Sequence, residues 1–138
     1  RVMASLASWK NTLAVLTLDG VGVDDRHIGA LNACESLAYL NITGTYITML
    51  GALKLPGLRV INISYMKDLP LRELQRFVGS RRPCLAKVVM LCMGFAVSNA
   101  NKILGHAANC YTVVCTYDMV GKMATLPACQ AWRFVCAF

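Results

Sequence analysis

Charged side chains are scarce in this chain. Only 15% of its 138 residues are charged and 57% are hydrophobic, whereas soluble domains carry about 25% charged residues. The chain is therefore unusually apolar for a protein that lives alone in water. We expect part of this apolar surface to be a repetitive core, and part to be covered by a partner or by the rest of a longer chain.

Paired metal-ligand motifs are also missing. The seven cysteines are an odd number and include no CxxC pair, which argues against a disulfide framework and favours an intracellular reducing compartment. That compartment is the cytoplasm or an organelle matrix such as the mitochondrial one. His106, Cys110 and Cys115 are the nearest approach to a zinc site, but zinc needs about four ligands. No metal and no cofactor are therefore predicted.

Motifs for catalysis are absent as well. The segment Gly20-Val-Gly22 lacks the further glycine and the lysine of a phosphate-binding loop. A nucleophile pair of Cys with His27 or His106 needs a third group to hold the base, and no motif supplies one. We interpret Asp24 and Asp25 as a helix cap and not as an acid pair. The chain is therefore predicted not to be an enzyme and to have no small-molecule substrate.

Long membrane-spanning runs are not evident. The uncharged run 36–53 has the length of a span, but its Asn, Thr and Gly residues weaken that interpretation, and the repeat described next explains the same residues. No membrane span is predicted. No secretory or transit segment is visible at Arg1, and the chain does not begin with Met, so we expect a processed form or a fragment.

The chain does contain a recurring spacing of apolar residues. Leu37, Leu40 and Ile42 occupy the first, fourth and sixth places of one segment. The spacing returns four more times, less regularly in the last two, at Leu13/Leu16/Leu18, Leu58/Ile61/Ile63, Leu85/Val88/Met90 and Tyr111/Val114/Thr116. The first places are 24, 21, 27 and 26 residues apart. Recurrence at about 20–29 residues is typical of a leucine-rich repeat.

Residues 28–48 carry this pattern most fully and resemble the ribonuclease-inhibitor-like, cysteine-containing branch of the leucine-rich-repeat family. Cys34 lies three residues before Leu37, and Ile47-Thr48 follows soon after the expected strand; both features recur in that branch. Cys84, one residue before Leu85, departs from it. The resemblance covers about residues 10–110. It implies an α/β leucine-rich-repeat solenoid of about four to five repeats, with parallel strands on a concave face and helices or turns on a convex face. It also implies a role in holding protein partners.

The predicted organisation has three parts. Residues 1–12 form an N-terminal helix, partial repeat or cap, residues 13–117 form the repeats, and residues 118–138 form a C-terminal capping segment. Asp24 or Asp25 is expected to cap a helix in the first repeat. Residues 71–78 predict an amphipathic helix with apolar residues on one stripe. Its core residues are Leu71, Leu74, Phe77 and Val78, and its outward-facing residues are Arg72, Glu73 and Arg76.

The candidate binding surface follows from the alternation of side chains along strands. If the leucines point inward, the residues between them form the concave face. Its members are Val15, Thr17, Asp19, Tyr39, Asn41, Thr43, Val60, Asn62, Ser64, Lys87, Val89 and Leu91, with Val113, Cys115 and Tyr117 beyond. An aromatic anchor and an apolar patch with polar surroundings suit protein recognition. Alternatively, the C-terminal segment folds over Val89 and Leu91 as part of the core.

Positive charge is concentrated in one region. Eight basic and two acidic residues fall within 54–87, which therefore holds +6 of the net charge of +7. Arg72, Arg76, Arg81 and Arg82 are expected on the convex side as a possible anion- or RNA-binding site. The alternative is a solvated surface that keeps an apolar protein in solution.

These observations favour a non-enzymatic protein–protein interaction scaffold that is a subunit of a larger complex. A second hypothesis is an RNA- or ribosome-associated scaffold that uses residues 54–87. A third, suggested by the family resemblance, is the substrate-recognition repeats of a ubiquitin ligase receptor, which would need an adaptor-binding motif outside this chain.

Overall fold

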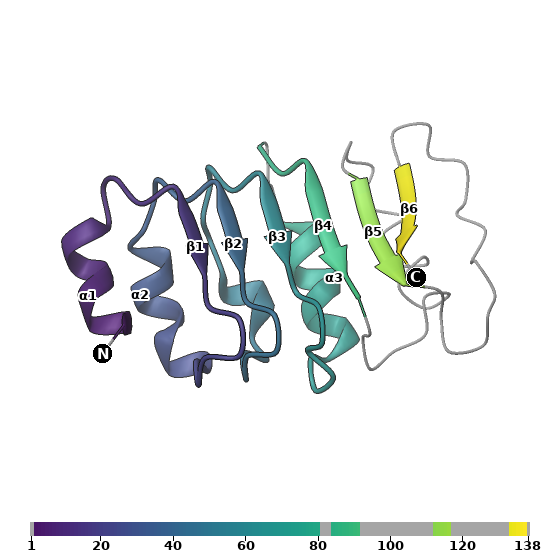
Figure 1. The fold of residues 1–138 in the computed structure, drawn as a ribbon, viewed down its shortest axis with the longest axis horizontal. Helices are drawn as coiled ribbons and strands as arrows, with labels where there is room; N and C mark the ends of the chain where they lie inside the picture. Colours follow the sequence, from purple (N-terminus) through teal and green to yellow (C-terminus); the bar gives the residue numbers. More distant parts are fainter. Residues whose placement is uncertain (1, 81–83, 92–111, 117–132, 138) are drawn as a thin grey trace.

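The computed structural model describes residues 2–80, 84–91, 112–116 and 133–137. The described residues form an α/β structure with one six-stranded parallel sheet (Figure 1). The elements in chain order are α1 (Val2–Trp9), β1 (Val15–Thr17), the 3-10 helix η1 (Asp25–His27), α2 (Ile28–Asn32), β2 (Tyr39–Asn41), the 3-10 helix η2 (Leu50–Ala52), β3 (Val60–Asn62), α3 (Leu71–Gly79), β4 (Lys87–Met90), β5 (Thr112–Thr116) and β6 (Arg133–Ala137). None of the helices in these ranges is long and apolar enough to cross a membrane.

The six strands follow one another across the sheet in chain order, and every neighbouring pair is parallel. The predicted parallel sheet is therefore confirmed. From α1 to the start of β4 the described segments outside the strands pass along one side of the sheet, where Figure 1 shows α1, α2 and α3. The other side is called the open face below. β6 lies within residues 118–138, where no strand was predicted, and pairs with β5.

The core lies between the sheet and the helices and is built from the recurring apolar residues. Leu16, Leu40, Ile61 and Val88, the fourth residues of the spacing, occupy matching positions in β1 to β4 and are buried. The sixth residues are buried too: Leu18, Ile42, Ile63 and Met90. Cys34 is fully buried, with its Sγ 3.6 Å from the carbonyl oxygen of Ala30. Each of the first four occurrences of the spacing therefore contributes its buried residues, which we call one layer, to a shared core.

The turns that follow β1, β2 and β3 share one backbone conformation. Gly20, Gly44 and Tyr65 have φ of +64°, +65° and +57°. Each lies three residues after its strand, and its N–H donates to the next layer, at 3.1 Å to the Thr43 carbonyl, 3.0 Å to the Ser64 carbonyl and 2.8 Å to the Leu91 carbonyl. Only glycine adopts this left-handed region without steric cost. In the third turn a tyrosine, Tyr65, adopts this left-handed conformation.

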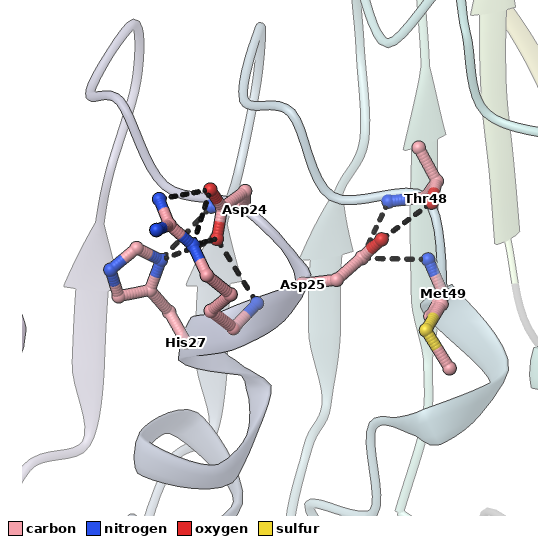
Figure 2. A network of polar contacts seen from close by, with 6 residues as sticks. Asp24, Asp25, His27, Thr48 and Met49 are labelled. Atoms are coloured by element: carbon pink, nitrogen blue, oxygen red, sulfur yellow. Dashed lines mark hydrogen bonds and ion pairs between the residues drawn. The ribbon is translucent and has the colours of Figure 1, made fainter.

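Carboxylates join neighbouring layers on the helical side (Figure 2). Asp24 is the N-cap of η1 and accepts from the Arg26 N–H. The prediction that an aspartate caps the helix with Ile28 and Leu31 holds only for η1, which leads into that helix, because the N-cap of α2 itself is His27, which makes no side-chain cap hydrogen bond. Asp25 instead reaches the next layer. Its carboxylate accepts from the Thr48 N–H at 2.8 Å, the Thr48 hydroxyl at 2.6 Å and the Met49 N–H at 2.9 Å. Asp25 therefore fixes the residues that lead into η2.

The helix α3 corrects one prediction. Leu74, Phe77 and Val78 are buried as expected, but Glu73, predicted to face outward, is 5% exposed. Its Oε1 accepts from the Gly51 N–H at 3.2 Å and its Oε2 from Arg76 at 3.1 Å. The side chain is buried because a neighbouring layer offers it a backbone donor, which the periodicity of one helix does not reveal.

Candidate interaction surface

The predicted concave residues of β1 to β4 lie on the open face of the sheet. Their neighbours in sequence, the recurring apolar residues, point into the core. Because paired residues of parallel strands point to the same face, the strand register arranges these side chains in rows. One row contains Val15, Tyr39, Val60 and Lys87, and the next contains Thr17, Asn41, Asn62 and Val89.

Val113 and Cys115 of β5 were predicted to join these residues, but they are paired by register with the buried positions Val88 and Met90. The predicted alignment of the fifth occurrence of the spacing is therefore wrong by one residue. Tyr117 lies outside the described residues.

Exposure varies along this face. Val15, Thr17, Asp19 and Lys87 are exposed, whereas Tyr39, Asn41, Thr43, Val60, Asn62, Val89 and Leu91 are half-buried. Val15 is 61% exposed, an unusual value for a large apolar residue on a strand. The face is therefore most accessible at β1 and at the start of β4, and the residues of β2 and β3 between them are half-buried.

Asn41 and Asn62 hold their strands' ends in the same way. The Oδ1 of Asn41 accepts from the Thr43 N–H at 3.0 Å and the Thr43 hydroxyl at 2.5 Å. The Oδ1 of Asn62 accepts from the Ser64 N–H at 3.0 Å and the Ser64 hydroxyl at 2.6 Å. Local hydrogen bonds of this kind are typical of Asx turns. The two side chains are therefore fixed in matching orientations on neighbouring strands.

Ser64 is not part of the accessible face. It was predicted there, but it is 1% exposed. Its hydroxyl oxygen accepts from the Leu91 N–H at 2.9 Å, so it joins the turn after β3 to the end of β4. Strand alternation fails at this position because Ser64 lies beyond the last residue of β3.

Charge is distributed unevenly along the open face. Asp19 is exposed after β1, and Lys87 is exposed at the start of β4. No ion pair joins Lys87 to another residue within the described ranges. The face thus has an acidic end near β1 and a basic residue toward β4.

The predicted anion-binding arginines are only partly placed. Arg72 and Arg76 are exposed on α3, on the helical side of the sheet. The Arg76 guanidinium forms an ion pair with the buried Glu73 carboxylate at 3.1 Å, so its positive charge is partly neutralised within the fold. Arg81 and Arg82 lie outside the described residues. The structure therefore separates Arg72 and Arg76 from the open face.

A hollow beside the sheet was not predicted. Residues 44–48 and 65–69 line a cavity of about 300 Å³. Tyr46 and Tyr65, which are 70% and 52% exposed, belong to its lining. The sequence places both tyrosines shortly after an expected strand, which could have indicated equivalent positions. Only the structure shows that the two side chains line one hollow.

The pKa values of Asp24, Asp25 and Cys34 are shifted by contacts within the fold. Hydrogen bonding to the Arg26 guanidinium lowers the pKa of Asp24 to about 2. Burial raises the pKa of Asp25, but the hydrogen bonds from Thr48 and Met49 outweigh it and the net pKa is lowered. Burial raises the pKa of the Cys34 thiol, which disfavours the reactive thiolate. Within the described ranges no three His, Cys, Asp or Glu side chains gather as a metal site; His106 and Cys110 lie outside them.

Comparison of the chain with models of known protein families, with curated proteins and with solved structures finds no match.

Proposed function

We propose that this chain is a leucine-rich-repeat solenoid that acts as a non-enzymatic protein–protein interaction scaffold within a larger intracellular complex. The observation that carries the proposal is the alignment of Tyr39, Val60, Asn41 and Asn62 in two rows on the open face. The recurring spacing explains this alignment, since each layer contributes the same two positions between its buried leucines.

The composition of the open face supports a protein partner. Tyr39 and Val60 are neighbours by register and are half-buried. Tyrosine is enriched among the residues that contribute most to protein interfaces once they are fully buried. Around them lie the amides of Asn41 and Asn62 and the exposed Lys87, which suit a polar rim. The low charge content of the whole chain is in keeping with a surface that is covered in a complex.

Site-specific photo-crosslinking tests the proposal. A benzoylphenylalanine placed at Tyr39 of the full chain, in the cells that produce it, should yield discrete protein adducts. The same group at Gln75, exposed on α3, is the matched control and should not yield them. The adducts should persist after RNase and high salt and should disappear when Val60→Asp is added. Adducts that form equally from both positions, or from Gln75 alone, would contradict the proposal.

The RNA-associated alternative rests on a different observation, the net charge of +6 in residues 54–87. Arg72 lies exposed on α3 and forms no ion pair with another described residue. If this region binds phosphates, RNA affinity should fall steeply with salt and should be lost in the variant with Arg72, Arg76, Arg81 and Arg82 changed to Glu. Absence of RNA binding by the unaltered chain at low salt would end this alternative.

A further inference from the structure

Two side-chain amides lie next to each other on the open face. Asn41 of β2 and Asn62 of β3 are paired by register, and neighbouring strands lie about 4.8 Å apart. Both residues are half-buried, and Figure 1 shows their strands side by side between β1 and β4. Their turns are hydrogen-bonded alike, so their amide groups have the same orientation.

The hydrogen bonds of the turns identify which end of each amide remains available. The backbone N–H groups of Thr43 and Ser64 can only donate, so the atoms they contact at 3.0 Å must be the Oδ1 oxygens. Each oxygen also accepts from a hydroxyl, which occupies both of its lone pairs. Neither Nδ2 group has an acceptor among the described residues. The sheet therefore presents two NH2 groups, which are donors only.

We propose that the Asn41–Asn62 amide pair binds a side-chain carboxylate of an acidic protein segment that lies along the open face. A carboxylate only accepts hydrogen bonds and has two oxygens, so one group can accept from both Nδ2 atoms. This inference rests on the proposed function and specifies the chemistry of the partner.

The charges around the pair favour an anionic partner. Lys87, exposed on β4, is paired by register with Val60, two residues before Asn62 along β3. Asp19 lies toward β1, in the direction of Asn41. An acidic segment is therefore attracted toward β3 and β4 and repelled from β1. Charge-assisted hydrogen bonds of this kind are about twice as strong as neutral ones.

A protein carboxylate fits this face better than a nucleic-acid backbone. RNA affinity comes mainly from Lys and Arg that neutralise several phosphates. On the open face of β1 to β4, Lys87 is the one basic residue; the register continues its row through Thr112 of β5 to Arg133 of β6. Neutral amides with one lysine suit a single carboxylate in a mostly uncharged interface.

The first test observes the amides themselves. The full chain, labelled with nitrogen-15, is titrated with a peptide of Glu residues and with the matched peptide of Gln residues. The side-chain NH2 signals of Asn41 and Asn62, identified by their loss in N41D and N62D, should shift saturably with the Glu peptide only. The signal of Asn32 should stay, because its Nδ2 already donates to the Ala52 carbonyl at 3.0 Å. Equal shifts with both peptides, or shifts confined to α3, would overturn the inference.

The second test measures affinity. Asn→Asp preserves the accepting oxygen of each turn and replaces the donor by an oxygen anion. Anisotropy of the labelled Glu peptide should show a loss of about tenfold or more for each of N41D and N62D. Q75E, which makes the same change on α3, should bind like the unaltered chain. Unchanged affinity in N41D/N62D, or an RNA oligonucleotide that shifts both amide signals at lower concentrations than the Glu peptide, would overturn the inference.

These outcomes are distinct from a failure of the proposed function. If adducts form from position 39 but the amide signals do not respond to the Glu peptide, the open face binds protein through other groups, and only the carboxylate inference fails. If neither occurs, both fail.

Discussion

Gly51 of η2 packs directly against Arg76 of α3. A Cβ added to Gly51 would lie 2.7 Å from the Cβ of Arg76 and 3.3 Å from the Oε1 of Glu73. Its N–H donates to that same Oε1. The two layers on the helical side thus approach so closely that only a hydrogen fits between the Gly51 Cα and the side chain of Arg76.

We expect Gly51→Ala to lower the free energy of unfolding by about 1–3 kcal/mol, because a methyl group forces η2 and α3 apart. Urea denaturation followed by circular dichroism measures this. Gly29→Ala is the control, since Gly29 lies in α2 with nothing within 4 Å of the added Cβ. It should be neutral or stabilise the chain by up to about 1 kcal/mol. Equal stability of the two variants would show that the close approach does not exist in solution.

The hydrogen bonds of Asp25 lead to a second prediction. Asp25→Ala removes the acceptor shared by Thr48 and Met49, which should cost about 1–2 kcal/mol at pH 7. Because the folded pKa of Asp25 is lowered from its ordinary 3.8, its ionised form stabilises the fold above that pH. This contribution is lost as pH falls below 3.8.

The difference in stability between the unaltered chain and Asp25→Ala should therefore narrow on acidification. Denaturation midpoints at pH 7, 5 and 3 would measure it, and Asp19→Ala, which removes an exposed carboxylate, is the comparison. A difference that grows as pH falls would contradict the lowered pKa.

The turn after β2 gives a third prediction. Gly44 has φ of +65° and nothing lies within 4 Å of an added Cβ, so any cost of Gly44→Ala comes from the backbone alone. That cost should be about 1–2 kcal/mol. Gly22→Ala, at a glycine with equal space but no left-handed φ, should leave the thermal midpoint within a degree or two or raise it. If both variants have the same thermal midpoint, Gly44 does not adopt the left-handed conformation in solution.

The sequence predicts the layers of this fold better than the contacts between them. Leu16, Leu40 and Ile61 can be aligned from spacing alone. Each layer buries the same positions, so the same spacing of apolar residues recurs in the sequence once for each layer. The open face follows from them by alternation, which is why Asn41 and Asn62 were predicted correctly as neighbours on one side of the sheet.

Contacts between layers depend on partners about 20 residues away, and no local pattern encodes them. Glu73 looks like an exposed helical residue until the Gly51 N–H is placed beside it. Ser64 looks like a strand residue that faces outward until the Leu91 N–H, which donates to its hydroxyl oxygen, is placed beside it. Tyr65 occupies a position where glycine occurs in the two preceding turns, so its conformation is set by the Leu91 carbonyl that its N–H contacts and not by its own preference.

The last prediction separates amides that serve the fold from amides that face a partner. Asn32 uses both ends: its Nδ2 donates to the Ala52 carbonyl at 3.0 Å, and its Oδ1 accepts from the Lys54 N–H at 2.8 Å. Asn32→Asp places an anionic oxygen against the carbonyl oxygen of Ala52, and we expect a loss of about 1–3 kcal/mol in unfolding free energy at pH 7.

Asn41→Asp and Asn62→Asp make the same chemical change but keep the hydrogen bonds that these side chains form with other described residues. Their unfolding free energies should therefore stay within about 0.5 kcal/mol of the unaltered chain. The three variants are compared by urea denaturation under identical conditions. A large loss in Asn41→Asp or Asn62→Asp would mean that its Nδ2 already has an acceptor in the folded chain, and the two amides would then belong to the architecture and not to the binding surface.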